Sequence, residues 1–255
     1  MKKSLLVLSL LGWALVGGAP LAEAGGPGSE DLKKITHRFP FTVLLEREGE
    51  LSDLLIYANM NQNIHVYSSV AGKLKMEWQS TNLGSPVTSI LALDLYQDGQ
   101  PELIFSTEAG RILIYDLADY SVVWENLQDR FEKIECLTAA NIDNDVQAEL
   151  IFVADSYLHI YDSHTKGLEW RSQDEVSARE ILVANVDDDD QPEIILSSGK
   201  ILDSKFYNVD LDSEIDFGER ISLLDINGDG FPEIIGEIGK FSLRVFDIYA
   251  ERVLW

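Results

Sequence analysis

The chain has 255 residues, 44 of them acidic and 20 basic, which gives a formal net charge of −24. This charge repels nucleic-acid phosphates and anionic membrane surfaces, so the composition argues against both as partners and favours cations or basic ligands. With 45% hydrophobic residues, the chain is long enough to bury one substantial core.

The first 24 residues have the pattern of a secretory signal peptide. Lys2 and Lys3 form a basic start, residues 5–16 are apolar, and Ala22 and Ala24 make a small-residue cleavage site. We expect cleavage after Ala24 and a secreted or periplasmic product without membrane insertion; the alternative is a retained N-terminal anchor. Residues 25–37 are predicted to be a flexible leader. Cys136 is the only cysteine, so no internal disulfide can form, and a bound metal is the more plausible stabilising cross-link.

Residues 38–255 contain five copies of one pattern, an acidic loop that runs directly into an apolar strand. The acidic residues that end these loops are separated, by subtraction, by 49, 47, 44 and 40 positions. Such a period predicts a propeller or solenoid, and the copies divide at about 38–84, 85–130, 131–176, 177–218 and 219–255. These residues are Asp53, Glu102, Glu149, Glu193 and Glu233.

Each copy has four short strand-like runs separated by Gly and Asp turns. In the second copy, for example, these runs are 90–93, 103–105, 112–115 and 122–124. Runs that are apolar on both faces, such as 150–153, are typical of inner strands between neighbouring sheets. We therefore predict an all-β fold, a five-bladed β-propeller made of four-stranded antiparallel blades.

Aromatic residues repeat with a similar period. Trp78, Trp124 and Trp170 are each 46 residues apart, Phe217 follows 47 residues later, and Trp255 ends the sequence. Their place at the end of the outer strand of each blade favours a packing role, the alternative being a platform on which a ligand stacks.

The acidic loops have the chemistry of calcium sites. The fifth copy is the clearest, because Asp225, Asn227 and Asp229 precede Gly230 and offer side-chain oxygens at alternate positions, before Glu233. The first copy has Leu45, Arg47 and Gly49 there and is degenerate. Asx turns without an ion are the alternative. The other predicted ligands are Asp94, Asp98, Glu102, Asn141, Asp143, Asp145, Glu149, Asn185, Asp187, Asp189 and Glu193.

These loops resemble the FG-GAP or VCBS-type repeats of integrin-α-like propellers. The resemblance implies Ca²⁺ bound by Asp225, Asn227, Asp229 and Glu233, with a backbone carbonyl from Phe231. Tyr96 replaces a ligand in the second copy and Val146 replaces the glycine in the third, so we expect occupancy to fall from copy five through four and three to two. The spacing of eight from Asp116, Asp162 and Asp247 to a tryptophan is similar to that in pyrroloquinoline-quinone-like propellers, a packing motif that implies no cofactor.

The sequence offers little for catalysis, so we expect a protein that is not an enzyme. It has no nucleophile elbow, phosphate loop or zinc spacing. The histidines are His37, His65, His159 and His164, of which His65 and His159 occupy matching places in their copies. A joint metal site of these two, or a glycosidase with carboxylates on different blades, are the alternatives.

We therefore predict a non-catalytic module that binds a protein or a glycan, with a periplasmic assembly scaffold that offers its blade edges as the next alternative. The amide-rich turn Asn59, Asn61, Gln62 and Asn63 is the first candidate surface, since amides suit sugar hydroxyls and peptide backbones equally. The sequence does not specify an oligomeric state. Turns expected on the same face carry Glu108, Asp155, Lys200 and Lys240.

Overall fold

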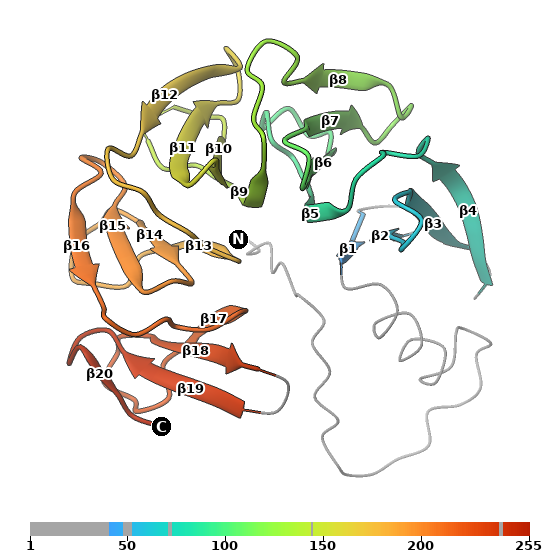
Figure 1. Ribbon diagram of the computed structural model, residues 1–255. Coiled ribbons are helices and arrows are strands. Elements are labelled where there is room, and N and C mark those ends of the chain that lie inside the picture. Colours follow the sequence, from blue (N-terminus) through green and yellow to red (C-terminus); the bar gives the residue numbers. More distant parts are fainter. Residues whose placement is uncertain (1–40, 48–52, 71–72, 144, 240–241) are drawn as a thin grey trace, which may run out of the picture. The chain divides into compact units, whose positions relative to one another are not determined.

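The computed structural model describes residues 41–255 apart from 48–52, 71–72, 144 and 240–241. The predicted signal peptide and leader, His37 and Lys240 lie outside the described residues. The described chain is all β, with five sheets of four antiparallel strands, and it contains no helix. Each sheet is a meander of four consecutive strands (Figure 1). This confirms the predicted fold class, a five-bladed β-propeller, and we number the sheets as blades one to five.

The chain divides into two compact units. The first unit holds blades one and two. Blade one consists of β1 (Thr42–Leu45), β2 (Leu54–Ala58), β3 (Ile64–Val70) and β4 (Lys73–Gln79). Blade two consists of β5 (Val87–Leu93), β6 (Glu102–Thr107), β7 (Ile112–Asp116) and β8 (Val122–Glu125).

The second unit holds blades three to five, together with the loops 94–100 and 108–111. Blade three consists of β9 (Ile134–Ala140), β10 (Glu149–Ala154), β11 (Tyr157–Asp162) and β12 (Gly167–Arg171). Blade four consists of β13 (Ile181–Ala184), β14 (Glu193–Leu196), β15 (Lys200–Asp203) and β16 (Val209–Asp212). Blade five consists of β17 (Ile221–Leu224), β18 (Glu233–Ile238), β19 (Ser242–Asp247) and β20 (Arg252–Val253).

Inner strands carry the core because both of their faces are covered. Every residue of β6 and of β10 is buried, as their two-sided apolar sequences predict. In the first unit, Ile56 and Val66 pack with Phe105, and in the second, Ile195 and Ile234 share a cluster between blades four and five. Each fully buried side chain of this size contributes about 1.5–3 kcal/mol to stability.

Four blades have an irregularity at the same place, between the third and fourth strands. The register shifts after Val66, Ile114, Ile160 and Ile201. A β-bulge bends the strand that carries it and re-aims the following side chains. The position just before the shift is paired with Trp78, Trp124, Trp170 and Leu211.

Two of the tryptophans pack between blades, as predicted, whereas Trp255 is 74% exposed. Trp78 of blade one stacks on Tyr120 of blade two, with ring centroids 5.3 Å apart, and Trp170 of blade three stacks on Tyr207 of blade four at 4.6 Å. Tyr120 and Tyr207 have positive φ values of 60° and 59°, because each lies in the tight turn between third and fourth strands.

The structure differs from the sequence interpretation at Phe217. The outer strand of blade four ends at Asp212, and Phe217 lies beyond it, fully buried against Phe246 of blade five at 4.9 Å. Leu211 takes the place that tryptophan has in the other blades. The prediction for Phe217 was wrong. Phe217 has the spacing of the repeated aromatic residues, but its ring packs against blade five and not at the end of the outer strand of blade four.

Candidate metal centres

The acidic loop of each of blades three to five is held by a buried glutamate at the start of the second strand. Glu149, Glu193 and Glu233 are almost inaccessible to solvent. Their Oε2 atoms accept hydrogen bonds from the backbone N–H groups of Ile142 at 2.8 Å, Val186 at 2.7 Å and Ile226 at 2.7 Å, respectively. The sheet thus fixes one carboxylate at the base of each loop.

In blade three this glutamate joins two aspartates. Oxygen atoms of Asp143, Asp145 and Glu149 all lie within 4.8 Å of one another. The loop is shaped by its own side chains, since the Oδ1 of Asp143 accepts from the backbone N–H of Asp145 at 2.7 Å and Asn141 Nδ2 donates to the carbonyl of Asp145 at 2.9 Å. Burial raises the pKa of Glu149 to about 7, and the charges of Asp143 and Asp145 act in the same direction.

Blade four repeats this arrangement. Asp187, Asp189 and Glu193 again offer oxygens within 4.8 Å of one another, and Asn185 Nδ2 donates to the carbonyl of Asp189. Burial, aided by Asp187 and Asp189, raises the pKa of Glu193 to about 7. In both loops the asparagine predicted as a ligand turns its amide nitrogen toward the loop backbone.

These two clusters could hold a metal ion. Two like unit charges about 4 Å apart repel by roughly 4 kcal/mol at an effective dielectric of 20, and a cation between them removes that cost. The donors are all oxygens, and carboxylate oxygens suit hard divalent cations such as Ca²⁺. The donor set therefore fits the ion that the sequence motif predicts.

The fifth loop keeps the hydrogen bond from the loop backbone to its glutamate, but its conformation differs, since Gly228 and Gly230 have φ values of 78° and 98°. Asn227 Nδ2 donates to Glu233 Oε1 at 2.7 Å and to Asp229 Oδ2 at 2.9 Å, so an amide links the two carboxylates. The carboxylate of Asp225 accepts from the N–H groups of Gly228 and Gly230. The ring of Phe231 stacks on Tyr249 at 5.1 Å. That this loop binds calcium most tightly stays a prediction.

In the second loop, two aspartates accept hydrogen bonds from the loop backbone, and one of these bonds closes an Asx turn. The carboxylate of Asp94 accepts from the N–H groups of Asp98 and Gly99 at 3.0 and 2.9 Å, and Asp98 Oδ1 accepts from Gln100 at 2.9 Å. The ammonium of Lys166 lies 4.0 Å from the centroid of the Tyr96 ring. Glu102 is buried at the start of β6. The loop of blade one, predicted as degenerate, ends in Asp53, whose Oδ1 accepts from Arg47 N–H at 3.2 Å.

The amide-rich turn is largely occupied by its own hydrogen bonds. The Oδ1 of Asn59 accepts from the N–H groups of Asn61 and Asn63, both at 3.0 Å, and Asn63 Nδ2 donates to the carbonyl of Ser80 at 2.9 Å. Asn61 is exposed, and Gln62 has a φ of 63°. Asn59 and Asn63 therefore shape the turn, which leaves Asn61 and Gln62 as its candidate contact residues.

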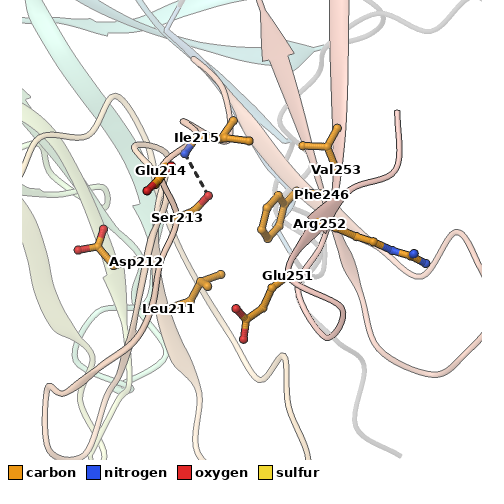
Figure 2. Close-up of a pocket in the computed structure, with 9 residues that line it drawn as sticks. All are labelled: Leu211, Asp212, Ser213, Glu214, Ile215, Phe246, Glu251, Arg252 and Val253. Atoms are coloured by element: carbon orange, nitrogen blue, oxygen red, sulfur yellow. Dashed lines mark hydrogen bonds between the residues drawn. The ribbon is translucent and has the colours of Figure 1, made fainter.

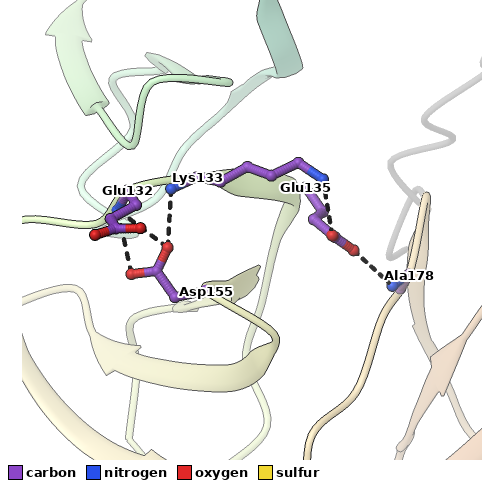
Figure 3. Close-up of polar contacts among 5 residues, drawn as sticks. All are labelled: Glu132, Lys133, Glu135, Asp155 and Ala178. Carbon is purple, nitrogen blue, oxygen red and sulfur yellow. Dashed lines mark hydrogen bonds and ion pairs between the residues drawn. The ribbon is translucent and has the colours of Figure 1, made fainter.

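The predicted surface acid Asp155 also has a structural role. Its Oδ1 accepts hydrogen bonds from the backbone N–H groups of Glu132 at 3.0 Å and Lys133 at 2.8 Å (Figure 3). The ammonium of Lys200 pairs with Asp212 at 2.7 Å. His65 and His159 each stack on an aromatic ring of their own blade, at 5.1 Å from Tyr57 and 5.2 Å from Phe152.

Two glutamates that the sequence interpretation missed connect neighbouring blades. The Oε2 of Glu135 accepts from the N–H of Ala178 at 3.3 Å, and its Oε1 pairs with Lys133 (Figure 3). The Oε2 of Glu180 accepts from the N–H of Ile221 at 2.6 Å, one blade further on. The two glutamates are 45 residues apart, close to the period of the repeat, and this spacing could have identified them in the sequence.

The residue two positions after each outer-strand tryptophan was missed as well. Ser80 and Ser172 accept, through Oγ, from the N–H groups of Ile64 at 2.9 Å and Leu158 at 3.0 Å. Asn126 Nδ2 donates to the carbonyl of Gly110 at 2.9 Å. A Trp-x-Ser or Trp-x-Asn pattern is visible in the sequence and fixes the inner hairpin of each of these blades.

Comparison with known proteins supports the fold. No family model and no curated protein matches the sequence. Among solved structures, the chain is similar to BBS1N in its complex with ARL6DN, soaked with lead, at a TM-score of 0.60 and 11% identity over 86% of this chain and 67% of that one. It is also similar to the V. cholerae biofilm matrix protein Bap1, at a TM-score of 0.58 and 16% identity, covering 84% of this chain and 38% of that one.

The Saccharomyces cerevisiae protein Sqt1 is similar at a TM-score of 0.57 and 11% identity, covering 77% of this chain and 56% of that one. The chain thus spans between about a third and two thirds of the length of these proteins. At such identities the likeness concerns the fold alone. No helix among the described residues has the length and hydropathy needed to cross a membrane.

Proposed function

We propose that this chain is an exported, calcium-binding β-propeller that acts as a non-catalytic module for binding a protein or glycan ligand. The observation that carries the proposal is the repeated carboxylate cluster in blades three and four, where Asp143, Asp145 and Glu149 have counterparts in Asp187, Asp189 and Glu193. Calcium bound at the loops rigidifies the edge of each blade and so pre-organises the surface that meets the ligand.

Calcium is favoured over other ions by the donor chemistry. The clustered donors are carboxylate oxygens, without the nitrogen or sulfur donors that select zinc or copper. The alternate spacing of side-chain oxygens in the loops resembles the FG-GAP and VCBS repeats. The charged start, apolar run and small-residue site of residues 1–24 support export, into compartments where calcium at about 10⁻⁴ to 10⁻³ M suits modules of this kind.

A binding role is supported by the use that similar folds make of their surfaces. BBS1N was solved in complex with ARL6DN, and Bap1 is a biofilm matrix protein. In this chain the sheets give a rigid frame, and exposed turns such as that at Asn61 and Gln62 offer polar contacts to a ligand. An assembly scaffold is the second candidate, favoured by an open groove between the edge strands of blades four and five.

The proposal is tested by thermal unfolding of the mature protein in chelator and in millimolar calcium. At about 100 times the Kd, one site adds roughly 2.7 kcal/mol to the free energy of unfolding. Asp145→Asn and Asp189→Asn are expected to reduce the calcium-dependent gain. The matched control is Asp98→Asn, which is expected to reduce it less, because the acids of its loop form no such cluster among the described residues. Identical melting curves with calcium and with chelator would overturn the calcium assignment.

A further inference from the structure

In two blades, a tryptophan of the outer strand stacks on a tyrosine of the next blade, and we call this ring pair the aromatic lock. Trp78 stacks on Tyr120 and Trp170 on Tyr207. Each tryptophan is the residue paired with the last position before the bulge, and Tyr120 and Tyr207 share the left-handed turn conformation. This geometry defines two positions, one on the outer strand of a blade and one in the turn of the next blade, whose counterparts can be located in blades four and five.

Between blades four and five both positions have changed. Leu211, paired with Ile201 before the bulge, stands in the tryptophan position. Glu251, four residues after Asp247 and with a φ of 51°, stands in the position of Tyr207, which follows Asp203 by four. The interface therefore lacks the two rings that fill the same place between blades one and two and between blades three and four.

A groove of about 280 Å³ is found at this place. Leu211 and Ile215 lie on one wall, and Phe246, Val253 and Glu251 lie on the other (Figure 2). Ile215 is 39% exposed and Val253 is 41% exposed, so this part of the apolar lining is open to solvent, whereas Phe246 is buried. The volume is just below the range of about 300–1,000 Å³ for small-molecule sites and suits one or two inserted side chains.

Each wall of the groove is a strand edge that pairs with no further strand in the part of the chain that the structure describes. β16 and β20 each have one neighbouring strand in their sheets. The N–H of Ser213 donates to Gly199 at 2.9 Å and that of Leu254 to Val245 at 2.8 Å, so these groups point into their own sheets. Because backbone groups alternate along an antiparallel strand, those of Asp212 and Val253 lie on the outer edges, where an added strand would pair.

The groove is negatively charged. Its lining has three acids, Asp212, Glu214 and Glu251, against one base, Arg252. Asp212 is paired with Lys200 at 2.7 Å, whereas Glu214 and Glu251 form no ion pair with another described residue. A ligand with a positive charge beside its apolar group would complement this lining.

We propose that the groove binds an extended segment of a partner protein that carries an aromatic residue flanked by basic residues. The aromatic side chain takes the place of the missing ring pair, between Leu211 and Val253. The basic residues face Glu214 and Glu251, and the backbone of the segment pairs with an open strand edge. This inference rests on the proposed binding function and gives it a site and a partner chemistry.

The first test introduces an aromatic lock between blades four and five. A fluorescein-labelled peptide with a central tryptophan, a valine on each side and lysines at both ends is titrated with the mature protein, and binding is followed by anisotropy. The double variant Leu211→Trp and Glu251→Tyr fills the groove and is expected to weaken binding by at least about tenfold, with a higher melting temperature. Unchanged affinity in this variant would overturn the proposal, as would the absence of binding to the unmodified protein up to millimolar concentration.

The second test reverses the charge of the groove. Glu214→Lys with Glu251→Lys is expected to weaken binding of the lysine peptide about tenfold or more, and to improve binding of the same peptide with glutamates at its ends. The matched control is Asp174→Lys with Glu175→Lys, an equal charge change at exposed acids outside the lining. Equal losses in both double variants would show general attraction to an acidic protein and would contradict the site.

These results are separable from the proposed function. If the double variant Leu211→Trp and Glu251→Tyr does not fold, as judged by circular dichroism, the charge-reversal experiment alone tests the groove. Calcium-dependent stability, or binding of another ligand that depends on Asn61, would survive the failure of the groove. Loss of the calcium response with retained peptide binding would contradict the calcium assignment alone.

Discussion

The side chains of Asn59 and His65 form a hydrogen bond of 2.8 Å that determines the tautomer of the histidine. The Oδ1 of Asn59 accepts from two backbone N–H groups, which leaves its Nδ2 facing His65 Nε2. Nε2 must therefore be the acceptor, so the proton of the neutral ring is on Nδ1. Nδ1 is buried without a hydrogen-bond partner among the described residues.

Protonation of His65 is expected to destabilise the amide-rich turn. A protonated Nε2 would face the amide of Asn59 donor to donor, and burial already lowers the pKa of His65. Because the unfolded chain, with a pKa near 6.5, then binds more protons than the folded one, this contribution to stability is intact above about pH 6.5 and is lost as the pH falls. The dependence stays below about 1.4 kcal/mol per pH unit, the limit for one group.

Urea unfolding between pH 5 and 7.5 measures this dependence. His65→Gln keeps an acceptor without a titrating proton. It should make the slope of stability against pH more negative than in the unmodified protein, because Glu149 and Glu193, whose pKa values are raised to about 7, still contribute with the opposite sign. His164→Gln, at an exposed position, is the control and should leave the slope unchanged. A His65→Gln curve parallel to that of the unmodified protein would contradict the assigned tautomer.

The acidic loops of blades three and four are expected to act independently. Asp145→Asn and Asp189→Asn should each remove part of the calcium-dependent rise in melting temperature, and the double variant should remove the sum, because the two clusters share no residue. Asp229→Asn tests whether the amide-linked loop of blade five contributes. Isothermal titration with calcium gives the number of sites directly, and an unchanged number in the double variant would rule out the clusters as ligands.

Gly236 is expected to tolerate no side chain. A Cβ atom at this position would lie 1.8 Å from the carbonyl oxygen of Phe217, which belongs to the backbone and cannot turn away. Gly236→Ala should destabilise the protein by about 1–3 kcal/mol or more. Gly84→Ala is a less crowded comparison, since nothing lies within 4 Å of its Cβ, although its φ of 75° adds strain. Equal melting temperatures for the Gly236 variant and the unmodified protein would exclude this close approach.

Removal of the indole of Trp170 is expected to weaken the interface between blades three and four. Its stacking on Tyr207 at 4.6 Å would be lost, with a cost toward the lower end of about 3–5 kcal/mol, since Trp170 is only half-buried. Leu168→Ala, on the same strand and 52% exposed, should change stability by no more than about 0.5 kcal/mol. Similar losses in the free energy of unfolding for both variants, measured by chemical denaturation, would contradict the stabilising role of the Trp170–Tyr207 stack.

Processing after Ala24 is expected in a cell that exports the protein. Intact-mass spectrometry of the purified product should give a chain that begins at Gly25, because the small residues at 22 and 24 fit a signal peptidase site. Replacement of Ala24 with a large residue should slow the cleavage. An intact N-terminus on membrane-bound protein would favour the anchor instead.

The number and content of the blades could be predicted from the sequence. Two-sided apolar runs such as that of β10 have to be covered on both faces, and their repetition with turns between them is compatible with few folds. The glutamates that begin the second strands were identified correctly as parts of the loops, because Glu149, Glu193 and Glu233 recur at one place in the repeat.

Other features were decided only by the tertiary structure. The rotamer of an asparagine depends on the groups around it, so Asn141 and Asn185 turn to backbone carbonyls, whereas Asn227 turns to two carboxylates. In blade four, the position that tryptophan occupies in other blades is taken by Leu211, because the strand register pairs Leu211 with Ile201. Phe217 fits the aromatic period of the sequence but lies beyond the outer strand. The period records which residue types recur, while packing against the next blade determines which side chains meet.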